Sequence, residues 1–276
     1  MALKVSKVTL DYGGKPVVEE IDFHVEKGDM VTIIGANGSG KSTILKALCR
    51  NLIPQNGIVY LDGKSIHKTD TRELAKKLAV LPQSPRVPDD FTVRDLISYG
   101  RFPHLGWTGR LQKNDFAVVD WAIEVTKMGA LQHRVVSTLS GGERQRAWIA
   151  MALAQQPEFL LLDEPTTFLD ICYQFEVLEL IKKLNMELNL TIVMVLHDLN
   201  QAARYSNHLI ALKDGKVYRK GTPREVITKT VLEDVFHIKV KIFNDHEHHC
   251  PYFIPVSSSL ADKFEATENV GREHCV

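Results

Sequence analysis

The most informative stretch of this 276-residue sequence is Val31-Thr-Ile-Ile-Gly35-Ala-Asn-Gly-Ser-Gly-Lys-Ser-Thr43. An apolar, β-rich run comes first, a glycine-rich loop follows, and the amphipathic segment 42–52 begins where the loop ends. The loop fits the pattern G-x-x-x-x-G-K-[ST], which binds polyphosphates when it joins a strand to a helix. Its glycines let backbone N–H groups turn inward, and the N-terminus of the helix adds partial positive charge. We therefore predict a strand, a phosphate-binding loop and a helix here.

Two side chains at the end of this loop carry the predicted chemistry. Lys41 places a full positive charge near the β- and γ-phosphates of a nucleotide, and Ser42 offers a hydroxyl to Mg²⁺. The alternative is an accidental glycine turn. Because glycine makes up only about 7% of residues in average proteins, a chance match to the whole pattern is rare.

A second stretch, Leu160-Leu-Leu-Asp163-Glu164-Pro165, supplies acidic groups. An apolar strand that ends in an acid places a carboxylate at the carboxyl edge of the sheet, where α/β folds bind ligands. We expect Asp163 to hold Mg²⁺ through a water molecule and Glu164 to polarise the attacking water. Taken alone, the stretch would fit a strand followed by a solvated acidic turn.

The composition is that of an ordinary globular protein, with 44% hydrophobic and 25% charged residues. Basic and acidic residues number 34 each, and the zero formal charge disfavours nucleic acid as the main partner. No apolar stretch approaches the ~20 residues of a membrane helix, and the N-terminus lacks the apolar part of a secretory signal. The four scattered cysteines indicate reduced thiols in a cytosolic protein. We expect any membrane role to be peripheral.

The predicted elements divide the chain into parts. Short strands alternate with helices in residues 1–84 and 157–240, which indicates one α/β unit with a mostly parallel sheet. Helical patterns dominate residues 85–156. Residues 241–276 form a polar C-terminal tail without a clear period. The tail carries a histidine and cysteine cluster whose spacing fits no structural zinc pattern, so we expect solvated side chains at His246, His248, His249, Cys250, His274 and Cys275.

The stretch Leu139-Ser140-Gly141-Gly142-Glu143-Arg-Gln-Arg146 opens one of the predicted helices. Ser140 and Glu143 have the spacing of a capping box. The two glycines leave backbone N–H groups and the Ser140 hydroxyl free to face an anion. A second phosphate-binding surface in a chain with one phosphate loop suggests that two copies share nucleotide.

With these motifs in this order, the chain resembles the ATP-binding subunits of ABC transporters over about residues 1–240. The resemblance implies a P-loop ATPase core with a mostly parallel sheet, an antiparallel β part at the N-terminus and a helical signature subdomain. It identifies residues 35–43 as the Walker A loop, 140–145 as the signature motif, and Asp163 with Glu164 as the Walker B pair. The implied nucleotide contacts are Gly35, Ala36, Asn37, Gly38, Ser39, Gly40, Lys41, Ser42, Thr43, Ser140, Gly141 and Gly142.

The same resemblance gives roles to four further residues. Tyr12 would stack on adenine, and Gln83 would approach Mg²⁺ and the attacking water. Asp170 would be the D-loop aspartate, and His197 would contact the γ-phosphate. Without the resemblance, Tyr12 would be an aromatic residue in a turn and Gln83 a loop amide. Asp170 would be an ordinary acid, and His197 a packed or surface histidine. The D-loop reads Thr-Phe-Leu-Asp where the family commonly has Ser-Ala-Leu-Asp. The expected catalytic residues are Glu164, His197 and Gln83, and the expected metal ligands are Ser42, Gln83 and Asp163.

Three stretches are similar to importers of ferric siderophores, haem and cobalamin, and favour the siderophore branch: Tyr99–His104, Arg144–Leu153 and Glu164–Ile171. The resemblance implies a homodimer that hydrolyses ATP with Mg²⁺ at the cytoplasmic face of the membrane. Two permease subunits would be contacted through residues 84–108, and an extracytoplasmic binding protein would be an indirect partner. The alternatives are an importer for haem or cobalamin and a soluble ABC ATPase, such as an iron–sulfur cluster assembly partner.

Overall fold

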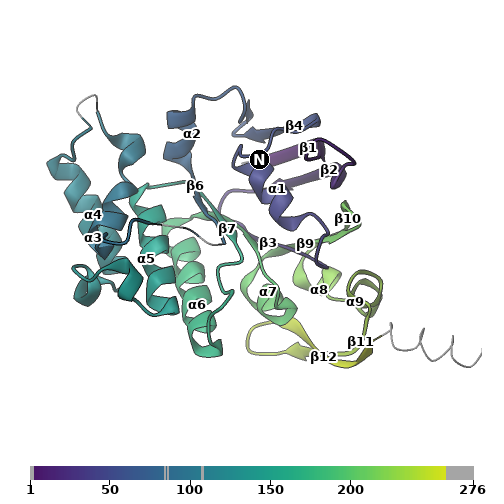
Figure 1. The fold of residues 1–276 in the computed structure, drawn as a ribbon. Helices are drawn as coiled ribbons and strands as arrows, with labels where there is room; N and C mark the ends of the chain where they lie inside the picture. The colour runs from purple at the N-terminus through teal and green to yellow at the C-terminus, as the bar shows by residue number, and fades with distance from the viewer. Residues whose placement is uncertain (1–2, 84, 86, 107–108, 259–276) are drawn as a thin grey trace, which may run out of the picture.

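The computed structural model describes residues 3–83, 85, 87–106 and 109–258, and its centre is a six-stranded sheet (Figure 1). The strand order is β10-β9-β3-β8-β7-β6, and every neighbouring pair is parallel except β9 with β10. The strands at the centre are buried on both faces, which explains their continuous apolar runs. The strands are β3 (Met30–Gly35), β6 (Leu78–Leu81), β7 (Phe159–Asp163), β8 (Thr191–Val195), β9 (His208–Lys213) and β10 (Lys216–Gly221).

A four-stranded antiparallel sheet, with the order β2-β1-β4-β5, forms the N-terminal part. In β2, inward residues such as Ile21 and Phe23 alternate with exposed polar ones, as expected for a sheet with one covered face. Helix α1 (Lys41–Leu48) packs on both sheets, and its buried side chains join them in one core. The predicted antiparallel part is therefore confirmed; its strands are β1 (Leu3–Leu10), β2 (Val18–Val25), β4 (Asn56–Leu61) and β5 (Lys64–Ser65).

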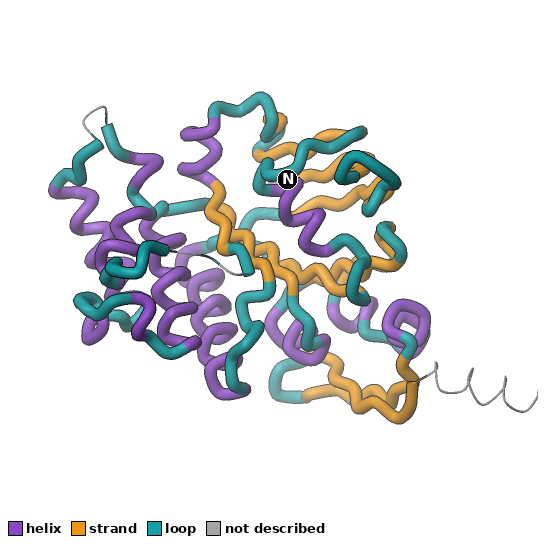
Figure 2. Tube along the Cα trace, viewed as in Figure 1, coloured by secondary structure: helices purple, strands orange, loops and turns teal. Residues whose placement is uncertain are grey.

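Most of the helices gather on one side of the parallel sheet (Figure 2). Helices α3, α4 and α5 pack on one another, and α6 lies against α5. The regular elements described between residues 85 and 156 are all helical, as the pattern predicts. The helices are α2 (Thr71–Lys77), α3 (Val93–Tyr99), α4 (Lys113–Val125), α5 (Gly141–Ala154), α6 (Ile171–Leu188), α7 (Leu199–Tyr205), α8 (Pro223–Val226) and α9 (Lys229–Phe236).

The structure differs from the sequence prediction mainly at the C-terminal end. The polar segment predicted as a tail from residue 241 belongs in part to a β-hairpin, β11 (Ile238–Asp245) and β12 (Cys250–Ser258). The hairpin packs on α7, α8 and α9 and buries Val240 and Phe253. Two prolines in β12, Pro251 and Pro255, obscure the strand pattern because proline cannot donate to a β-ladder.

The histidines of this hairpin do not assemble a metal site. His248 Nδ1 lies 2.8 Å from Asp245 Oδ2 and is occupied by that contact. Within residues 3–258, apart from the undescribed positions 84, 86, 107 and 108, no three His, Cys, Asp or Glu side chains are grouped to hold a metal ion. His274 and Cys275 lie outside the described residues. None of the described helices has the length and apolar character needed to cross a membrane.

A buried ion pair ties the loop after α3 to the helical block. The Arg101 side chain is 7% exposed and its Nε donates to Asp115 Oδ1 at 3.0 Å. Its Nη1 donates to the Ala154 carbonyl at 2.8 Å and to Gln156 Oε1 at 2.9 Å. Burial by itself raises the pKa of Asp115, but the Gln112 N–H and the Arg101 guanidinium outweigh it and hold that pKa below its ordinary value.

We expect Asp115→Asn to lower the free energy of unfolding by about 3 kcal/mol at neutral pH, because it leaves the Arg101 charge buried without a counter-ion. The matched control is Asp120→Asn in the same helix, whose ion pair with Arg94 is solvent-exposed and is worth under about 1 kcal/mol. Since the pKa of Asp115 is depressed, its contribution is present at neutral pH and is lost as the pH falls through that pKa. Urea unfolding at several pH values measures both effects; equal losses in the two variants would contradict the argument.

Candidate nucleotide-binding site

The loop between β3 and α1 approaches the antiparallel sheet so closely that a glycine is required. Gly40 precedes α1 with a left-handed φ of 98°, and a Cβ there would lie 2.5 Å from Val18 Cγ2. No side chain caps the N-terminus of α1. The first N–H groups of the helix are therefore open to an anion, as the loop pattern predicts.

Lys41 is folded back over this loop. Its side chain is buried, and Nζ donates to the carbonyl oxygens of Gly35 at 2.9 Å and Ala36 at 3.0 Å. Burial lowers the pKa of Lys41, although the Glu164 and Asp163 carboxylates oppose the shift. Among the described residues, the buried Ser39 hydroxyl has no hydrogen-bond partner. A cation and an unpaired donor in one loop suit a polyphosphate group.

Ser42 and Asp163 bring the two predicted halves of the site together. Ser42 Oγ donates to Asp163 Oδ1 at 3.0 Å, although the residues are 121 positions apart in the chain. Burial raises the pKa of Asp163, and the hydrogen bond from Ser42 opposes that shift. A hydroxyl and a carboxylate side by side are oxygen donors of the kind that Mg²⁺ takes together with phosphate oxygens and water. The donor set therefore fits this cofactor.

Glu164 is the meeting point of the predicted catalytic residues. Its backbone is left-handed, with a φ of 53°, which is uncommon outside glycine and concentrates at functional sites. Its carboxylate accepts hydrogen bonds from Gln83 Nε2 and, at 3.0 Å, from Thr167 Oγ1. His197 Nε2 lies 2.6 Å from its other oxygen. The structure thus brings Gln83, Glu164 and His197 into direct contact.

Tyr12 lies at the open side of α1. The residue is 59% exposed, and its hydroxyl lies 3.4 Å from both Thr43 Oγ1 and Lys46 Nζ. The Lys46 ammonium is 5.4 Å from the centre of the ring. The ring is thus attached to the helix that follows the phosphate loop while remaining accessible, which suits a stacking platform for a base.

The predicted signature residues have structural roles of their own. The capping box is present: the Ser140 N–H donates to Glu143 Oε2 at 2.9 Å, and the Glu143 N–H to Ser140 Oγ at 3.4 Å. A Cβ at Gly142 would lie 2.6 Å from Tyr173 Cδ1, and one at Gly141 would lie 3.0 Å from Leu169 Cδ2. These glycines therefore also permit the close approach of α5 to the segment around Asp170. The Asp170 side chain itself makes no capping hydrogen bond to α6.

The sequence motifs did not identify Thr167 or Lys46 as neighbours of the site. Thr167 lies three residues after Glu164, and Lys46 lies one turn beyond Ser42 on α1. The described part of the chain has no hydrogen bond or ion pair between residues 140–142 and residues 35–43. The signature and the phosphate loop are thus separate surfaces of one chain.

Comparison with known proteins gives a consistent result. The profile of the ABC transporter family matches residues 18–167. The chain is 49% identical over 244 residues to the iron(3+)-hydroxamate import ATP-binding protein FhuC of Bacillus subtilis (strain 168), covering 88% of this chain and 91% of that protein. It is 42% identical over 254 residues to the ferric enterobactin transport ATP-binding protein FepC of Escherichia coli (strain K12), covering 92% and 94%.

Solved structures agree with the sequence relatives. An inward-facing putative metal-chelate type ABC transporter matches with a TM-score of 0.81 and 28% identity, covering 94% of this chain and 98% of the other. The ATP-binding cassette MJ0796, solved as a post-hydrolysis dimer bound to ADP and Pi, matches with a TM-score of 0.70 and 29% identity, covering 80% and 98%. The predicted P-loop α/β fold is confirmed, and the chain belongs to the ABC transporter family as an ATP-binding, ATP-hydrolysing subunit.

Proposed function

We propose that this chain is the ATPase subunit of an importer that powers the uptake of ferric siderophores. The observation that carries the proposal is the joint geometry of Lys41, Asp163, Glu164 and His197 at one sheet edge, in a chain closely similar to iron–siderophore import proteins. The chain would work as a homodimer at the cytoplasmic face of the membrane, beneath two permease subunits and, indirectly, a binding protein outside. The alternative of a soluble ABC ATPase without a permease finds no support in the comparisons.

In this proposal, each part of the site has one task. The N–H groups before α1, the Ser39 hydroxyl and the Lys41 ammonium bind the phosphates, and Tyr12 stacks on the base. Ser42 and Asp163, with Gln83, would hold Mg²⁺, which supplies charge neutralisation at the phosphate oxygens. Ser140, Gly141, Gly142 and Asp170 would reach the nucleotide of the second copy, because they form a surface separate from the phosphate loop.

Glu164 takes the role of general base toward water. Both of its carboxylate oxygens are engaged, by Gln83 and Thr167 on one side and by His197 on the other. The three contacts leave Oε1 with acceptor capacity for a water molecule, because a carboxylate has about four lone-pair sites. His197, whose side chain is half exposed, lies at the rim of the site and can move to the terminal phosphate while Glu164 remains buried.

Residues 84–108 carry the proposed permease contact. Within this segment Tyr99 and Phe102 are 59% and 71% exposed, whereas Arg101 is buried in its ion pair. Trp107, which belongs to this segment, lies outside the described residues. We therefore assign the contact to Tyr99 and Phe102 and give Arg101 the task of holding their loop on α5.

We expect Lys41→Ala to weaken ATP binding at least tenfold, because a charge-assisted contact is worth about 1.5–3 kcal/mol. Isothermal calorimetry measures the change. The matched control is Lys46→Ala on the same helix, which removes one equal charge beside Tyr12 and should have a smaller effect. Unchanged affinity in Lys41→Ala, with normal thermal unfolding, would remove the phosphate site from this loop.

We expect Glu164→Gln to slow hydrolysis at least ~100-fold while ATP binding stays nearly normal, because the amide keeps the shape but loses the basic oxygen. His197→Ala should also slow turnover and leave ADP binding nearly intact. Thr167→Val is the matched control, since it removes one hydrogen bond to Glu164 and no titratable group; we expect less than a tenfold effect. Near-normal turnover in Glu164→Gln would place the base elsewhere.

The cargo is tested by deleting the gene and growing cells under iron restriction with a range of ferric siderophores. We expect the wild-type chain to restore siderophore-dependent growth and Glu164→Gln not to restore it. If siderophore uptake is normal and haem or cobalamin uptake fails, the siderophore is the wrong cargo, but the chain is still the ATPase of an importer. An absence of any uptake defect, together with purification in soluble complexes alone, would overturn the importer itself.

A further inference from the structure

A second pocket of about 420 Å³ lies on a part of the chain that contains no residue of the nucleotide site. Its walls come from the C-terminal half of α6, the connection between α7 and β9, the start of α8 and the turn between β11 and β12. The volume falls in the range of small-ligand pockets. The unpredicted C-terminal hairpin closes one side of it.

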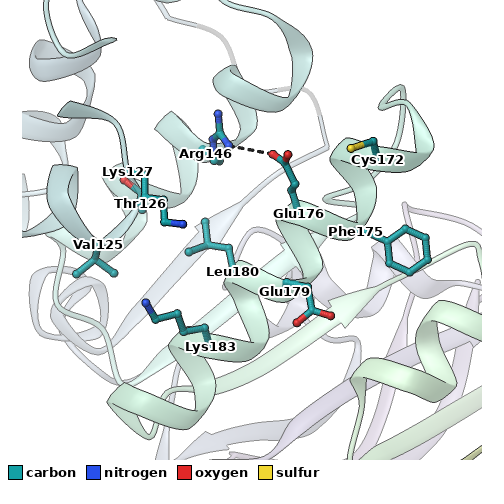
Figure 3. Close-up of a pocket in the computed structure, with 10 residues that line it drawn as sticks. All are labelled: Val125, Thr126, Lys127, Arg146, Cys172, Phe175, Glu176, Glu179, Leu180 and Lys183. Carbon is teal, nitrogen blue, oxygen red and sulfur yellow. Dashed lines mark hydrogen bonds and ion pairs between the residues drawn. The ribbon is translucent and has the colours of Figure 1, made fainter. Parts of the chain in front are cut away.

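The ionisable residues that line this pocket are mainly basic. Lys182, Arg204 and Arg224 line it, with His248 and His249 at the hairpin turn, and its lining contains no Asp or Glu. A neighbouring pocket of about 770 Å³, also lined by α6, contains both acidic and basic side chains (Figure 3). There Arg146 pairs with Glu176 at 3.0 Å, while Glu179, which also lines that pocket, accepts a hydrogen bond from the Tyr205 hydroxyl at 2.7 Å.

The cations of the 420 Å³ pocket have few acidic partners. Arg224 is exposed and Lys182 is half-buried, and neither has an ion pair or hydrogen bond to any described residue. Arg204 reaches Glu179 with one terminal nitrogen at 3.6 Å, but its Nε is buried without a partner. The turn itself contains the exposed Glu247, and Asp245, just before the turn, is engaged by His248. Buried donors without partners cost free energy unless a ligand supplies acceptors.

Two of these cations lie close to the same aromatic ring. Lys182 Nζ lies 5.8 Å from the centre of the Tyr205 ring, and the Arg204 guanidinium lies 5.4 Å from the same ring. Burial and the Asp245 carboxylate raise the pKa of the Cys250 thiol, which lines the pocket, and Arg204 and Lys182 both oppose the shift. Both charges therefore act on the same buried group, as they would on a bound anion.

We propose that this pocket binds a small phosphate-bearing polyanion at a site distinct from the nucleotide site. The Arg204 and Arg224 guanidinium groups match the geometry of phosphate oxygens, and Lys182 adds a point charge. The pocket joins α6, which follows Asp170, to α7, which follows His197. An anion held between Lys182 and Arg204 would fasten together the two helices that carry these site residues.

The test is calorimetric titration with inorganic pyrophosphate, without nucleotide or Mg²⁺, of the full chain carrying Lys41→Ala, which suppresses binding to the phosphate loop. We expect one binding site per chain, weakened at least tenfold by adding Lys182→Gln or Arg224→Gln. The matched control is adding Lys183→Gln, which removes an equal charge from the next residue of α6, on the neighbouring pocket. It should leave the affinity unchanged.

Three results would overturn the proposal: no binding in the Lys41→Ala chain, equal weakening by Lys183→Gln and Lys182→Gln, or unchanged affinity in both Lys182→Gln and Arg224→Gln. Thermal unfolding with and without pyrophosphate provides a second measurement, because a ligand of the folded chain raises the midpoint. The rise should disappear with Lys182→Gln and persist with Lys183→Gln. Neither outcome depends on ATP hydrolysis or on the identity of the cargo.

Discussion

The parallel register of β3, β7 and β8 is the constraint on which the site depends. Ile33 and Asp163 both pair with Val195, so the three strands reach the same edge at the same level. Lys41, Glu164 and His197 then follow within a few residues of that edge. A shift of one residue in any pairing would turn the strand's side chains to the opposite face and separate these groups. The long apolar runs that fix the register therefore also fix the chemistry.

Most of the fold and the core of the site could be predicted because their signals are local. The loop before Lys41 and the strand before Asp163 are contiguous motifs, and alternating strands and helices suffice to predict a parallel sheet. What could not be predicted depends on distant partners. The C-terminal hairpin acquires its buried face from α7 and α9, and Arg101 is buried because Asp115 and the end of α5 surround it.

The same distinction holds inside the site. Gln83 and His197 are ordinary loop residues by pattern, and the resemblance to a family was needed to single them out. The structure shows what the pattern lacks: both side chains reach the carboxylate of Glu164, from the ends of β6 and β8. Their contact is a product of strand order, since β7 lies between β6 and β8 in the sheet.

Gly142, a predicted nucleotide contact, also has a role in packing. Its missing side chain admits the Tyr173 ring, so α5 and α6 meet there in the isolated chain. Any larger residue would push the two helices apart before a second copy arrives. Loss of function from such a variant therefore carries no information about nucleotide sharing. Removing the Ser140 hydroxyl crowds no neighbour but takes away the N-cap of α5, so genetic dissection of the dimer at that position needs a parallel measurement of stability.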